Sequence, residues 1–372
     1  TPLLVVVFLR GGADFLNMVV PVGDPTYALV RPTIGLTEED GLLLLEDDFA
    51  LHPALAPLEP LWDDGELAAV TCVGSPHVTR SHFDAQDFME RGAPGMRHVT
   101  TGWLNRYLQV TRREDESELR AVALQNLLPR ALRGDYPALA LPPGLGRKLD
   151  ADTLAEFEAL YGDAGSMETG PEEAGEVLAS GRATIGTLRR LQEILDAPPS
   201  DEGIAWPRSA FARSLRSLAT LARADCGLEV AAVDYPGWDH HINQGGVEGT
   251  QARMLADYAA SLAAFRVALG PRMERTLVVT MTEFGRTVAE NGNNGSDHGR
   301  GGGMFLLGGG VRGGRVHGRW KGLETKDLAD GRDLPVTTDF RDVLAASLEG
   351  LFGFDVPKGF FPDYKPGSIA LF

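Results

Sequence analysis

The stretch Leu3-Leu-Val-Val-Val-Phe-Leu9, followed directly by Arg10-Gly11-Gly12, decides the fold class of this chain. It is an unbroken apolar run, it is rich in β-branched valine, and it is too short for a helix that is buried all round. Such a run is typical of a strand covered on both faces, as the central strands of parallel sheets are. The glycine pair indicates a turn where this strand ends.

Similar apolar runs recur along the chain and alternate with segments that have the apolar spacing of helices. We predict further strands at 67–73, 228–233, 276–281 and 304–307, and helices at 53–63, 82–91, 250–269 and 338–352. Alternating strands and helices favour an α/β fold, a three-layer αβα sandwich around a mostly parallel central sheet. We therefore interpret residues 1–372 as a single domain.

Residues 113–225 differ from the rest of the chain because they are richer in charged side chains. We predict helices at 151–162, 172–197 and 208–224, with weaker strand runs at 119–124 and 136–141. This composition favours a largely helical insertion or cap within the domain.

The composition excludes several classes of protein. The formal net charge of −17 repels phosphate backbones, and no long Lys/Arg cluster offsets it, so we do not expect nucleic-acid binding. No stretch approaches the roughly 18 unbroken apolar residues of a transmembrane helix. Cys72 and Cys226 are too few and too isolated for a disulfide framework or a cysteine-based zinc site. The sequence gives no indication of the oligomeric state.

The chain begins at Thr1, and its first predicted core strand starts only two residues later. This beginning is typical of an exported protein whose signal has been removed, or of a trimmed chain. The sequence leaves both origins open.

Polar side chains follow four of the predicted strands, at the sheet edge where open parallel sheets bind ligands. These residues are Asp14 after the first strand, Ser81 and His82 after the second, Asp239 to His241 after the third, and Glu283 and Arg286 after the fourth. Asp297 and His298 lie in the glycine-rich segment 291–303 that comes next. Their coincidence at one edge predicts a functional site.

Asp239-His240-His241 is the most informative of these groups. A carboxylate and imidazoles within three residues can offer oxygen and nitrogen donors to one divalent ion. Alternate side chains of an extended segment share a side, so Asp239 and His241 can converge while His240 points away. A solvated polar loop is the alternative. We expect zinc first, with manganese, iron or calcium also possible.

His298 lies between glycines, where the backbone can approach a ligand closely, and Asp297 precedes it. A histidine in a loop is more often a surface residue, so that alternative stays open. Asp14, after Gly11-Gly12, has a competing role as a turn or helix cap.

Ser81 is predicted at a helix N-terminus, where backbone N–H groups and the helix dipole stabilise an anion. Such a serine could attack phosphorus or sulfur if a metal lowered its pKa, and plain N-capping is the alternative. His82 could donate a proton, and Arg80 and Arg286 could hold an oxyanion through bidentate contacts. Arg286 could equally pair with Glu283 in a purely structural role.

Six segments of the chain resemble the domain-of-unknown-function-1501 family over nearly the whole length. They are Leu9-Arg-Gly-Gly-Ala-Asp14, Ser81-His-Phe-Asp-Ala-Gln86, Gly102-Trp-Leu-Asn-Arg106, Gly237-Trp-Asp-His-His241, Thr282-Glu-Phe-Gly-Arg-Thr287 and Asp297-His-Gly-Arg300. That family is placed in the alkaline phosphatase–sulfatase superfamily, and many members carry a twin-arginine export signal. The resemblance implies a metal-centred αβα sandwich and export to the periplasm or cell envelope.

The resemblance also implies roles for individual residues, since the superfamily holds two divalent ions around a nucleophile at a helix N-terminus. Asp14 resembles the metal carboxylate of the first strand, Ser81 the nucleophile, and Asp239, His241 and His298 the ligands of one metal. Glu283 takes the place of an Asp in an Asp-His pair whose histidine is replaced here by Phe284. Alternatively Asp297-His298 is that pair, and His317 is then a weak substitute for the last histidine.

These residues predict a metal-dependent hydrolase that acts on small phosphate or sulfate esters, and the partner is a small anionic ester or, for the alternative below, a bound anionic glycan. The alternative is a catalytically reduced, metal-binding envelope protein of the same fold, which Phe284 in place of a histidine motivates. A serine hydrolase with His82 and Asp84 or Asp87 as partners is less favoured, because neighbouring residues of a helix point in different directions.

Overall fold

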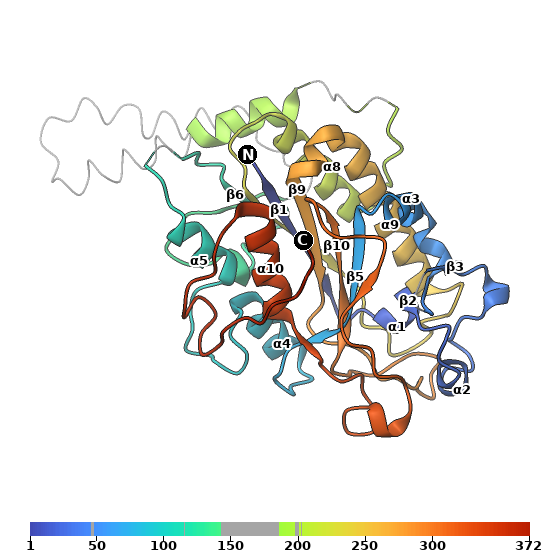
Figure 1. The fold of residues 1–372 in the computed structure, drawn as a ribbon. Helices are drawn as coiled ribbons and strands as arrows, with labels where there is room; N and C mark the ends of the chain where they lie inside the picture. Colours follow the sequence, from blue (N-terminus) through green and yellow to red (C-terminus); the bar gives the residue numbers. More distant parts are fainter. Residues whose placement is uncertain (46–47, 115, 143–185, 198–200, 202) are drawn as a thin grey trace, which may run out of the picture.

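The computed structural model describes residues 1–45, 48–114, 116–142, 186–197, 201 and 203–372. Its central sheet has the strand order β11-β5-β10-β9-β1-β8-β6-β7, with β12 paired to β5 (Figure 1). The strands are β1 (Leu3–Arg10), β5 (Leu67–Gly74), β6 (Ala121–Ala123), β7 (Leu139–Ala140), β8 (Val230–Pro236), β9 (Thr276–Met281), β10 (Gly302–Gly308), β11 (Val316–His317) and β12 (Thr338–Asp339).

The first predicted strand, β1, lies in the middle of this sheet and pairs in parallel with both β8 and β9. Every other pairing is also parallel, except that β10 runs antiparallel to its two neighbours, β5 and β9. The prediction of a mostly parallel sheet is therefore confirmed. Because β10 alone is reversed, it begins at the edge where the other strands end.

Two apolar cores cover the two faces of the sheet. Along β1 the odd-numbered side chains from Leu3 to Leu9 belong to one core, and the even-numbered side chains from Leu4 to Phe8 belong to the other. Helices α8 (Ala210–Arg223) and α9 (Thr250–Leu269) pack on the first face, and α5 (Trp103–Val110) and α10 (Phe340–Phe352) on the second (Figure 1). The predicted three-layer αβα sandwich is thus confirmed.

Shorter elements connect these layers. They are the helices α1 (Phe15–Met18), α2 (Thr26–Val30), α3 (Glu59–Asp63) and α4 (His82–Arg91), the 3₁₀ helices η1 (Glu38–Asp40), η2 (Pro53–Leu58), η3 (Arg130–Leu132), η6 (Gly270–Arg275) and η7 (Thr325–Asp327), and a separate small sheet of β2 (Val19–Val20), β3 (Leu43–Leu44) and β4 (Ala50–Leu51). The predicted helix at 53–63 is in fact η2 followed by α3. Its prolines lack the N–H that a continuous α-helix requires.

Residues 113–225 contribute to the sandwich itself. Strands β6 and β7 extend the central sheet beyond β8, and α8 packs against β8 and α9. The described strands β6 and β7 and helix α8 are therefore part of the sandwich, and the short apolar strand β6 is fully buried beside β8. The helical insertion or cap expected over 113–225 stays a prediction. The predicted helix at 208–224 is confirmed as α8, and residues 186–196 are helical. The predicted helix at 151–162 and the first part of the one at 172–197 lie outside the described residues.

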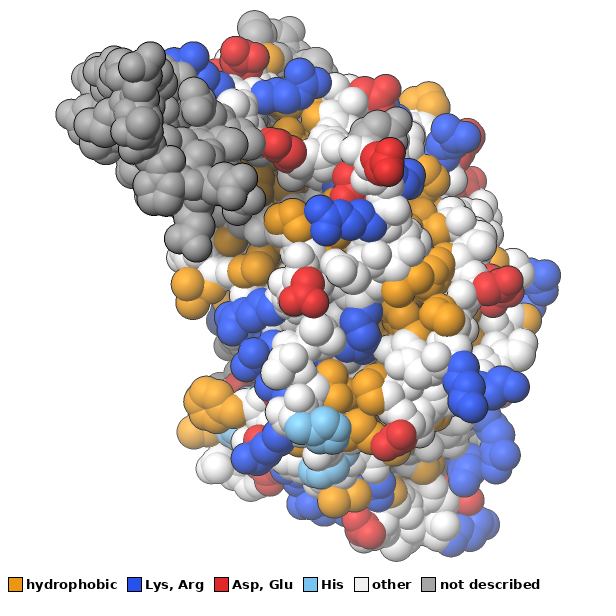
Figure 2. Space-filling model, turned by 90° about the vertical axis from the view of Figure 1, so that its left-hand side faces the viewer, with side chains coloured by type: hydrophobic (Ala, Val, Ile, Leu, Met, Phe, Trp, Pro, Cys, Tyr) orange, Lys and Arg blue, Asp and Glu red, His pale blue; other side chains and the backbone are white. Residues whose placement is uncertain are grey.

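The surface fits the composition in two respects. Acidic and basic side chains are intermingled on the face shown in Figure 2, so the net charge of −17 is not gathered into one acidic field on that face. Within the described ranges, none of the helices combines the length and the apolar character that crossing a membrane requires.

Candidate metal centre

The predicted polar residues follow the strands to one edge of the sheet. The carboxyl ends of β1, β5, β8 and β9 share this edge because these strands run in one direction. The loops after β5 and β8 carry His82 and Asp239, respectively. The reversed strand β10 begins at the same edge, and so the loop that enters it brings His298 there.

Asp239 lies among three histidines at this edge. Its Oδ1 is 3.0 Å from His241 Nε2 and 3.2 Å from His298 Nε2, and these two nitrogens are 2.9 Å apart. Its Oδ2 is 3.4 Å from His82 Nε2. His82, Asp239 and His298 offer donor atoms that all lie within 4.8 Å of one another, which makes them a candidate metal-binding group.

Each of the three imidazoles is held from behind through its Nδ1. The contacts are 2.7 Å from His82 to Glu283 Oε1, 2.9 Å from His241 to Asp297 Oδ1, and 2.8 Å from His298 to the carbonyl oxygen of Arg80. Carboxylate and carbonyl oxygens only accept hydrogen bonds, so each Nδ1 carries the hydrogen. The Nε2 of each neutral ring then presents a lone pair, which is the form that binds a metal.

The converging atoms fit a divalent cation. The facing lone pairs of His241 and His298 repel each other unless a cation lies between them, and the buried Nε2 of His82 has no hydrogen-bond partner. Ligands placed tetrahedrally at about 2.0–2.1 Å from a zinc ion lie roughly 3.3 Å apart. The contacts of Asp239 Oδ1 with His241 and His298, at 3.0 Å and 3.2 Å, are near this spacing, as is the 3.4 Å contact of Oδ2 with His82. The two nitrogens of His241 and His298, at 2.9 Å, lie closer than a bound ion would place them.

Charges and burial around the cluster favour ionised Asp239 and neutral His298, and they raise the basicity of His82. Partial burial opposes ionisation of Asp239, but the hydrogen bond and the charge of Arg286 lower the pKa of Asp239 to about 2. Burial lowers the pKa of His298 and so favours its neutral form. The hydrogen bond to Glu283 raises the pKa of His82, which makes its Nε2 a more basic donor.

Arg286 is a structural partner of Asp239. Its Nη2 lies 2.6 Å from Asp239 Oδ1, and all three of its nitrogens donate within the protein, to this carboxylate and to backbone oxygens. The side chain is fully buried. The structure therefore pairs Arg286 with Asp239 and not with Glu283, and leaves it no exposed N–H for the oxyanion that its sequence position suggested.

Glu283 and Asp297, predicted as metal ligands, lie behind the histidines. Glu283 is 1% exposed and accepts hydrogen bonds from His82, from Gln86 Nε2 at 2.9 Å and from the Gly11 N–H at 2.9 Å. Burial opposes its ionisation, but the hydrogen bonds from His82 and Gln86 hold the pKa of Glu283 below its ordinary value. Both carboxylates thus orient histidine rings, a role that carboxylates commonly have behind metal-binding histidines.

Asp14 lies apart from this group. Its two oxygens are 2.6 Å and 3.0 Å from the guanidinium nitrogens of Arg31, and Gln244 Nε2 donates to it at 2.6 Å. Arg31 neutralises its charge, and Asp14 is not among the metal-binding groups found in the described residues. The structure therefore gives Asp14 an ion pair where the resemblance implied a metal.

Ser81 is the N-cap residue of α4, immediately before His82, and its side chain makes no capping hydrogen bond. It is exposed at the helix N-terminus, as the sequence predicts. Phe284 is buried, with ring centroids 4.9 Å from His82 and 4.7 Å from His298, so it packs against the two rings. The third imidazole of the cluster therefore comes from His82, for which the sequence suggested proton donation.

The neighbouring histidines lie outside the cluster. His240 is buried with neither ring nitrogen hydrogen-bonded, and burial lowers the pKa of His240 to about 4. The alternation expected for Asp239, His240 and His241 is thus observed. His317 lies on β11, where its Nε2 contacts the carbonyl oxygen of Arg312.

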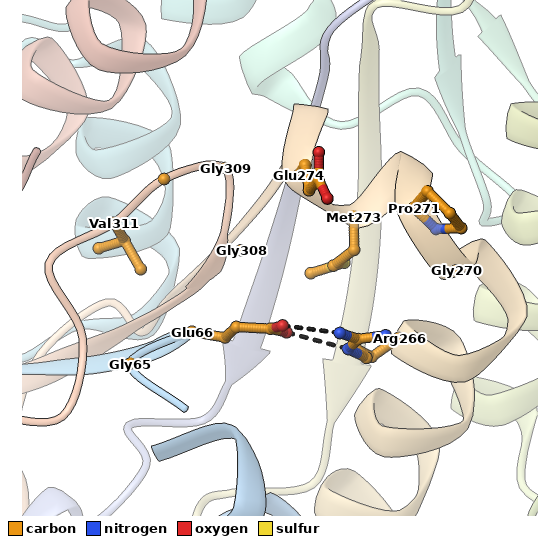
Figure 3. Close-up of a pocket in the computed structure, with 11 residues that line it drawn as sticks. Gly65, Glu66, Arg266, Gly270, Pro271, Met273, Glu274, Gly308, Gly309 and Val311 are labelled. Atoms are coloured by element: carbon orange, nitrogen blue, oxygen red, sulfur yellow. Dashed lines mark hydrogen bonds and ion pairs between the residues drawn. The ribbon is translucent and has the colours of Figure 1, made fainter. Parts of the chain in front are cut away.

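A separate pocket of about 450 Å³ lies at the opposite edge of the sheet, beside the start of β5 and the end of β10 (Figure 3). Glu66 and Arg266 face each other across it, joined by two hydrogen bonds of 2.7 Å and 2.9 Å. This pair neutralises itself, so Glu274 is the other charged residue among those that line the pocket, and the lining has no histidine that could join it in holding a metal.

The fold and the site define an α/β sandwich with a candidate metal centre at the carboxyl edge of its sheet. The chain belongs to the family described as "Protein of unknown function (DUF1501)", whose profile matches residues 2–358. This match confirms the family that the sequence motifs indicate. No curated protein matches the chain.

Solved structures of sulfatase and phosphoester enzymes are similar in overall shape. A sulfatase, PsFucS1 from Pseudoalteromonas sp., is 12% identical over 94% of this chain and 68% of its own, with a TM-score of 0.43. The C-terminal periplasmic domain of EcEptC from Escherichia coli is 11% identical over 98% of this chain and 88% of its own, with a TM-score of 0.39. The same domain in complex with Zn is 11% identical over 82% of this chain and 72% of its own, with a TM-score of 0.36. With TM-scores below 0.5, the assignment of the site rests on this chain's own residues.

Proposed function

We propose that this protein is a metal-dependent hydrolase of phosphate or sulfate esters. The observation that carries the proposal is the convergence of three imidazole Nε2 atoms on the carboxylate of Asp239, with contacts of 3.0–3.4 Å. Each ring is oriented by an acceptor at its Nδ1, as metal-binding histidines are. This arrangement of donors and orienting acceptors supports the proposal of a metal centre.

His82, Asp239, His241 and His298 would hold the ion, with Glu283, Asp297 and Arg286 supporting them. A divalent ion at this position supplies stabilisation of the negative charge that develops on ester oxygens during hydrolysis. Three nitrogen donors with one carboxylate suit zinc, manganese or iron better than calcium, which prefers oxygen ligands. Zinc is our first choice.

Ser81 is the proposed nucleophile. It stands at the N-terminus of α4, where N–H groups of the first turn and the helix dipole favour an anionic group. Its hydroxyl is exposed and is not used in capping, and the next residue, His82, is a proposed ligand. An ester held at the cluster would therefore lie within reach of Ser81.

We propose a single ion at this centre. Of the other carboxylates predicted to bind metal, Asp14 is paired with Arg31 and Glu283 is bonded to His82. This observation also favours a second candidate function, a metal-binding protein of the same fold with reduced turnover. In either case we propose that the protein is exported, as the family resemblance implies.

Metal analysis of the purified protein and assays with 4-nitrophenyl phosphate and 4-nitrophenyl sulfate test both functions. We expect about one divalent ion per chain in the wild type and in an Asp225→Ala control at an exposed aspartate, and very little in Asp239→Ala. Ser81→Ala should keep the metal and lose turnover by at least about a hundredfold.

Three results would decide against one or both proposals. A wild-type protein that binds no divalent ion would exclude both functions. If the wild type binds metal but hydrolyses neither ester, and Ser81→Ala behaves in the same way, the second function is favoured over the first. Full metal content in Asp239→Ala would show that other residues are the ligands.

A further inference from the structure

Arg80 and Arg332 form a pair of guanidinium groups beside His298, which we name the arginine pair. Arg80 Nη2 is 2.6 Å from Asp333 Oδ2, and Arg332 Nε is 2.9 Å from Asp333 Oδ1. Arg332 Nη2 donates to the backbone oxygen of His298 at 2.8 Å, and His298 Nδ1 donates to the backbone oxygen of Arg80 at 2.8 Å. Both arginines are therefore joined directly to one proposed ligand.

Asp333 fixes this pair without neutralising it. Its side chain is fully buried, and its backbone is bridged to Thr287 and Ala329. One carboxylate between two guanidinium groups offsets one of their two positive charges. The remaining charge also acts on Asp297, whose pKa is lowered first by the hydrogen bond with His241 and further by Arg332. The side chains of Arg80 and Arg332 are 39% and 45% exposed, so a solute can reach them.

The arginine pair lies away from the converging atoms of the cluster. Its contacts with His298 are to Nδ1 and to the backbone oxygen, whereas Nε2 of that ring faces Asp239. An anion on the arginine pair is therefore a different chemical group from the one held at the cluster. Two anionic positions on either side of one histidine fit a substrate with two anionic groups.

We propose that the arginine pair binds a second acidic group of the substrate, so that the preferred ester carries another phosphate, sulfate or carboxylate besides the group attacked. Guanidinium groups recognise such groups through paired N–H donors and stay charged at every physiological pH. The sequence alone suggests Arg80 only for the reacting group and does not single out Arg332. This inference rests on the proposed function for the identity of the first group.

Binding of matched sugar phosphates tests the proposal. We expect wild-type protein, loaded with metal, to bind glucose 1,6-bisphosphate about tenfold more tightly than glucose 6-phosphate in calorimetry, since a charge-assisted hydrogen bond is lost with the second phosphate. Arg332→Gln and Arg80→Gln should each reduce this preference to about twofold. Arg253→Gln, at an exposed arginine of α9, is the matched control and should keep it.

Three measurements separate this inference from the proposed function. Metal content and thermal melting of each variant show whether the cluster and the fold survive, and Arg332→Lys should restore part of the preference because it returns the charge. Equal affinity for the two sugars in the wild type, or an unchanged preference in both glutamine variants, would overturn the inference. If the protein binds no metal and hydrolyses neither ester, but still binds the bisphosphate more tightly in a way that depends on the two arginines, the proposed function alone would be overturned.

Discussion

His82 owes its orientation to one buried carboxylate. Glu283 receives its Nδ1 hydrogen at 2.7 Å and is itself held by Gln86 and by the backbone of Gly11. Because His82 is the first residue of α4, at the exposed start of the helix, this hydrogen bond fixes the direction in which Nε2 faces Asp239. A residue without direct contact to an ion can thus determine how well the ion is bound.

We therefore expect Glu283→Gln to weaken metal binding by about 10- to 100-fold, because the neutral amide is a poorer acceptor and reduces the basicity of the ring. Competition with a chromogenic chelator measures this affinity. Glu66→Gln, in the pocket at the opposite edge, is the control and should bind metal as the wild type does. Equal affinities in Glu283→Gln and Glu66→Gln would contradict the role given to Glu283.

A second prediction concerns His52, which is fully buried far along the chain from the proposed ligands. Its Nδ1 accepts from the Ala54 N–H at 3.0 Å and its Nε2 donates to the Gly246 carbonyl at 3.1 Å, so the neutral ring is the form that fits. Burial lowers the pKa of His52 in the folded state. The unfolded chain therefore binds a proton more readily, and this contribution to stability is complete above about pH 6.5 and is lost as the pH falls below it.

We expect His52→Asn to be less stable than the wild type at pH 8 and the difference to narrow at pH 5, since asparagine can still accept from Ala54 but does not titrate. Urea unfolding at the two pH values, with the metal concentration held constant, measures the difference. A gap that stays constant or widens toward pH 5 would contradict the prediction.

At the residue scale the structure brings together most of the residues that the sequence places at this edge, and their roles as metal ligands stay predictions. Asp239, His241 and His298 were predicted as ligands, and all three converge. Glu283, Asp297 and His82 were each predicted at the site, but position along the chain cannot show which side of a ring a carboxylate contacts. Asp14 could not be placed because Arg31, its partner, belongs to no recognisable motif.

At the scale of elements, the end of β5 contains a backbone irregularity. Gly302 of β10 pairs with Val73 of β5, and the next residue, Gly303, pairs with Thr71. Cys72, between Thr71 and Val73, is therefore the extra residue, and its φ is 54°. This is a β-bulge, which bends a strand and redirects the chain beyond it. After the bulge, Val73 and Gly74 pair with β12, and the chain then enters the loop that leads to His82.

Substitutions of Cys72 test the strain at this bulge. The left-handed region is unfavourable for side chains in general and most unfavourable for β-branched ones. We expect Cys72→Val to be less stable than Cys72→Ala by at least about 1 kcal/mol, although valine is the larger apolar side chain for a fully buried position. Denaturant unfolding of the two variants measures this, and a more stable Cys72→Val would show that the strand relaxes without cost.

The elements themselves were predicted according to their length and burial. The strands β1, β5 and β9 are long apolar runs, and the sequence places them within a residue or two. Helix α5 was not predicted, although Trp103, Leu104, Tyr107 and Leu108 repeat at helical spacing and are buried. The strands β6 and β7 were expected as weak runs, and only their pairing beside β8 makes them part of the sheet.

At the scale of the whole molecule, the proposed ligands come from segments far apart in the sequence. They follow β5 and β8 and precede β10, so an ion would connect three segments of the chain. These segments come together only on folding, and an ion would therefore bind the folded state and not the unfolded one. We expect added zinc to raise the melting temperature, with about 2.7 kcal/mol of stabilisation at a free concentration one hundred times the dissociation constant. Scanning calorimetry with and without a chelator measures it.

Asp239→Ala provides the contrast, since its melting temperature should not respond to zinc at the same concentrations. An equal response in wild type and variant would show that the stabilisation comes from ions bound elsewhere. The class of fold and the edge that carries the site were predictable from the order of apolar runs. The direction of β10 was not, because an apolar run does not indicate which way its strand lies in a sheet.

The reversed strand β10 also has a consequence for the order in which the molecule is completed. It lies between β5 and β9, which do not pair with each other in the described sheet. Until Gly302–Gly308 have been made, β5 therefore has no partner strand among those described, and β9 has an open edge. His298 enters at the same moment. Insertion of this one strand joins β5 to β9, and the loop that enters it delivers the last proposed ligand, so the proposed metal centre can be complete only after β10 has been made.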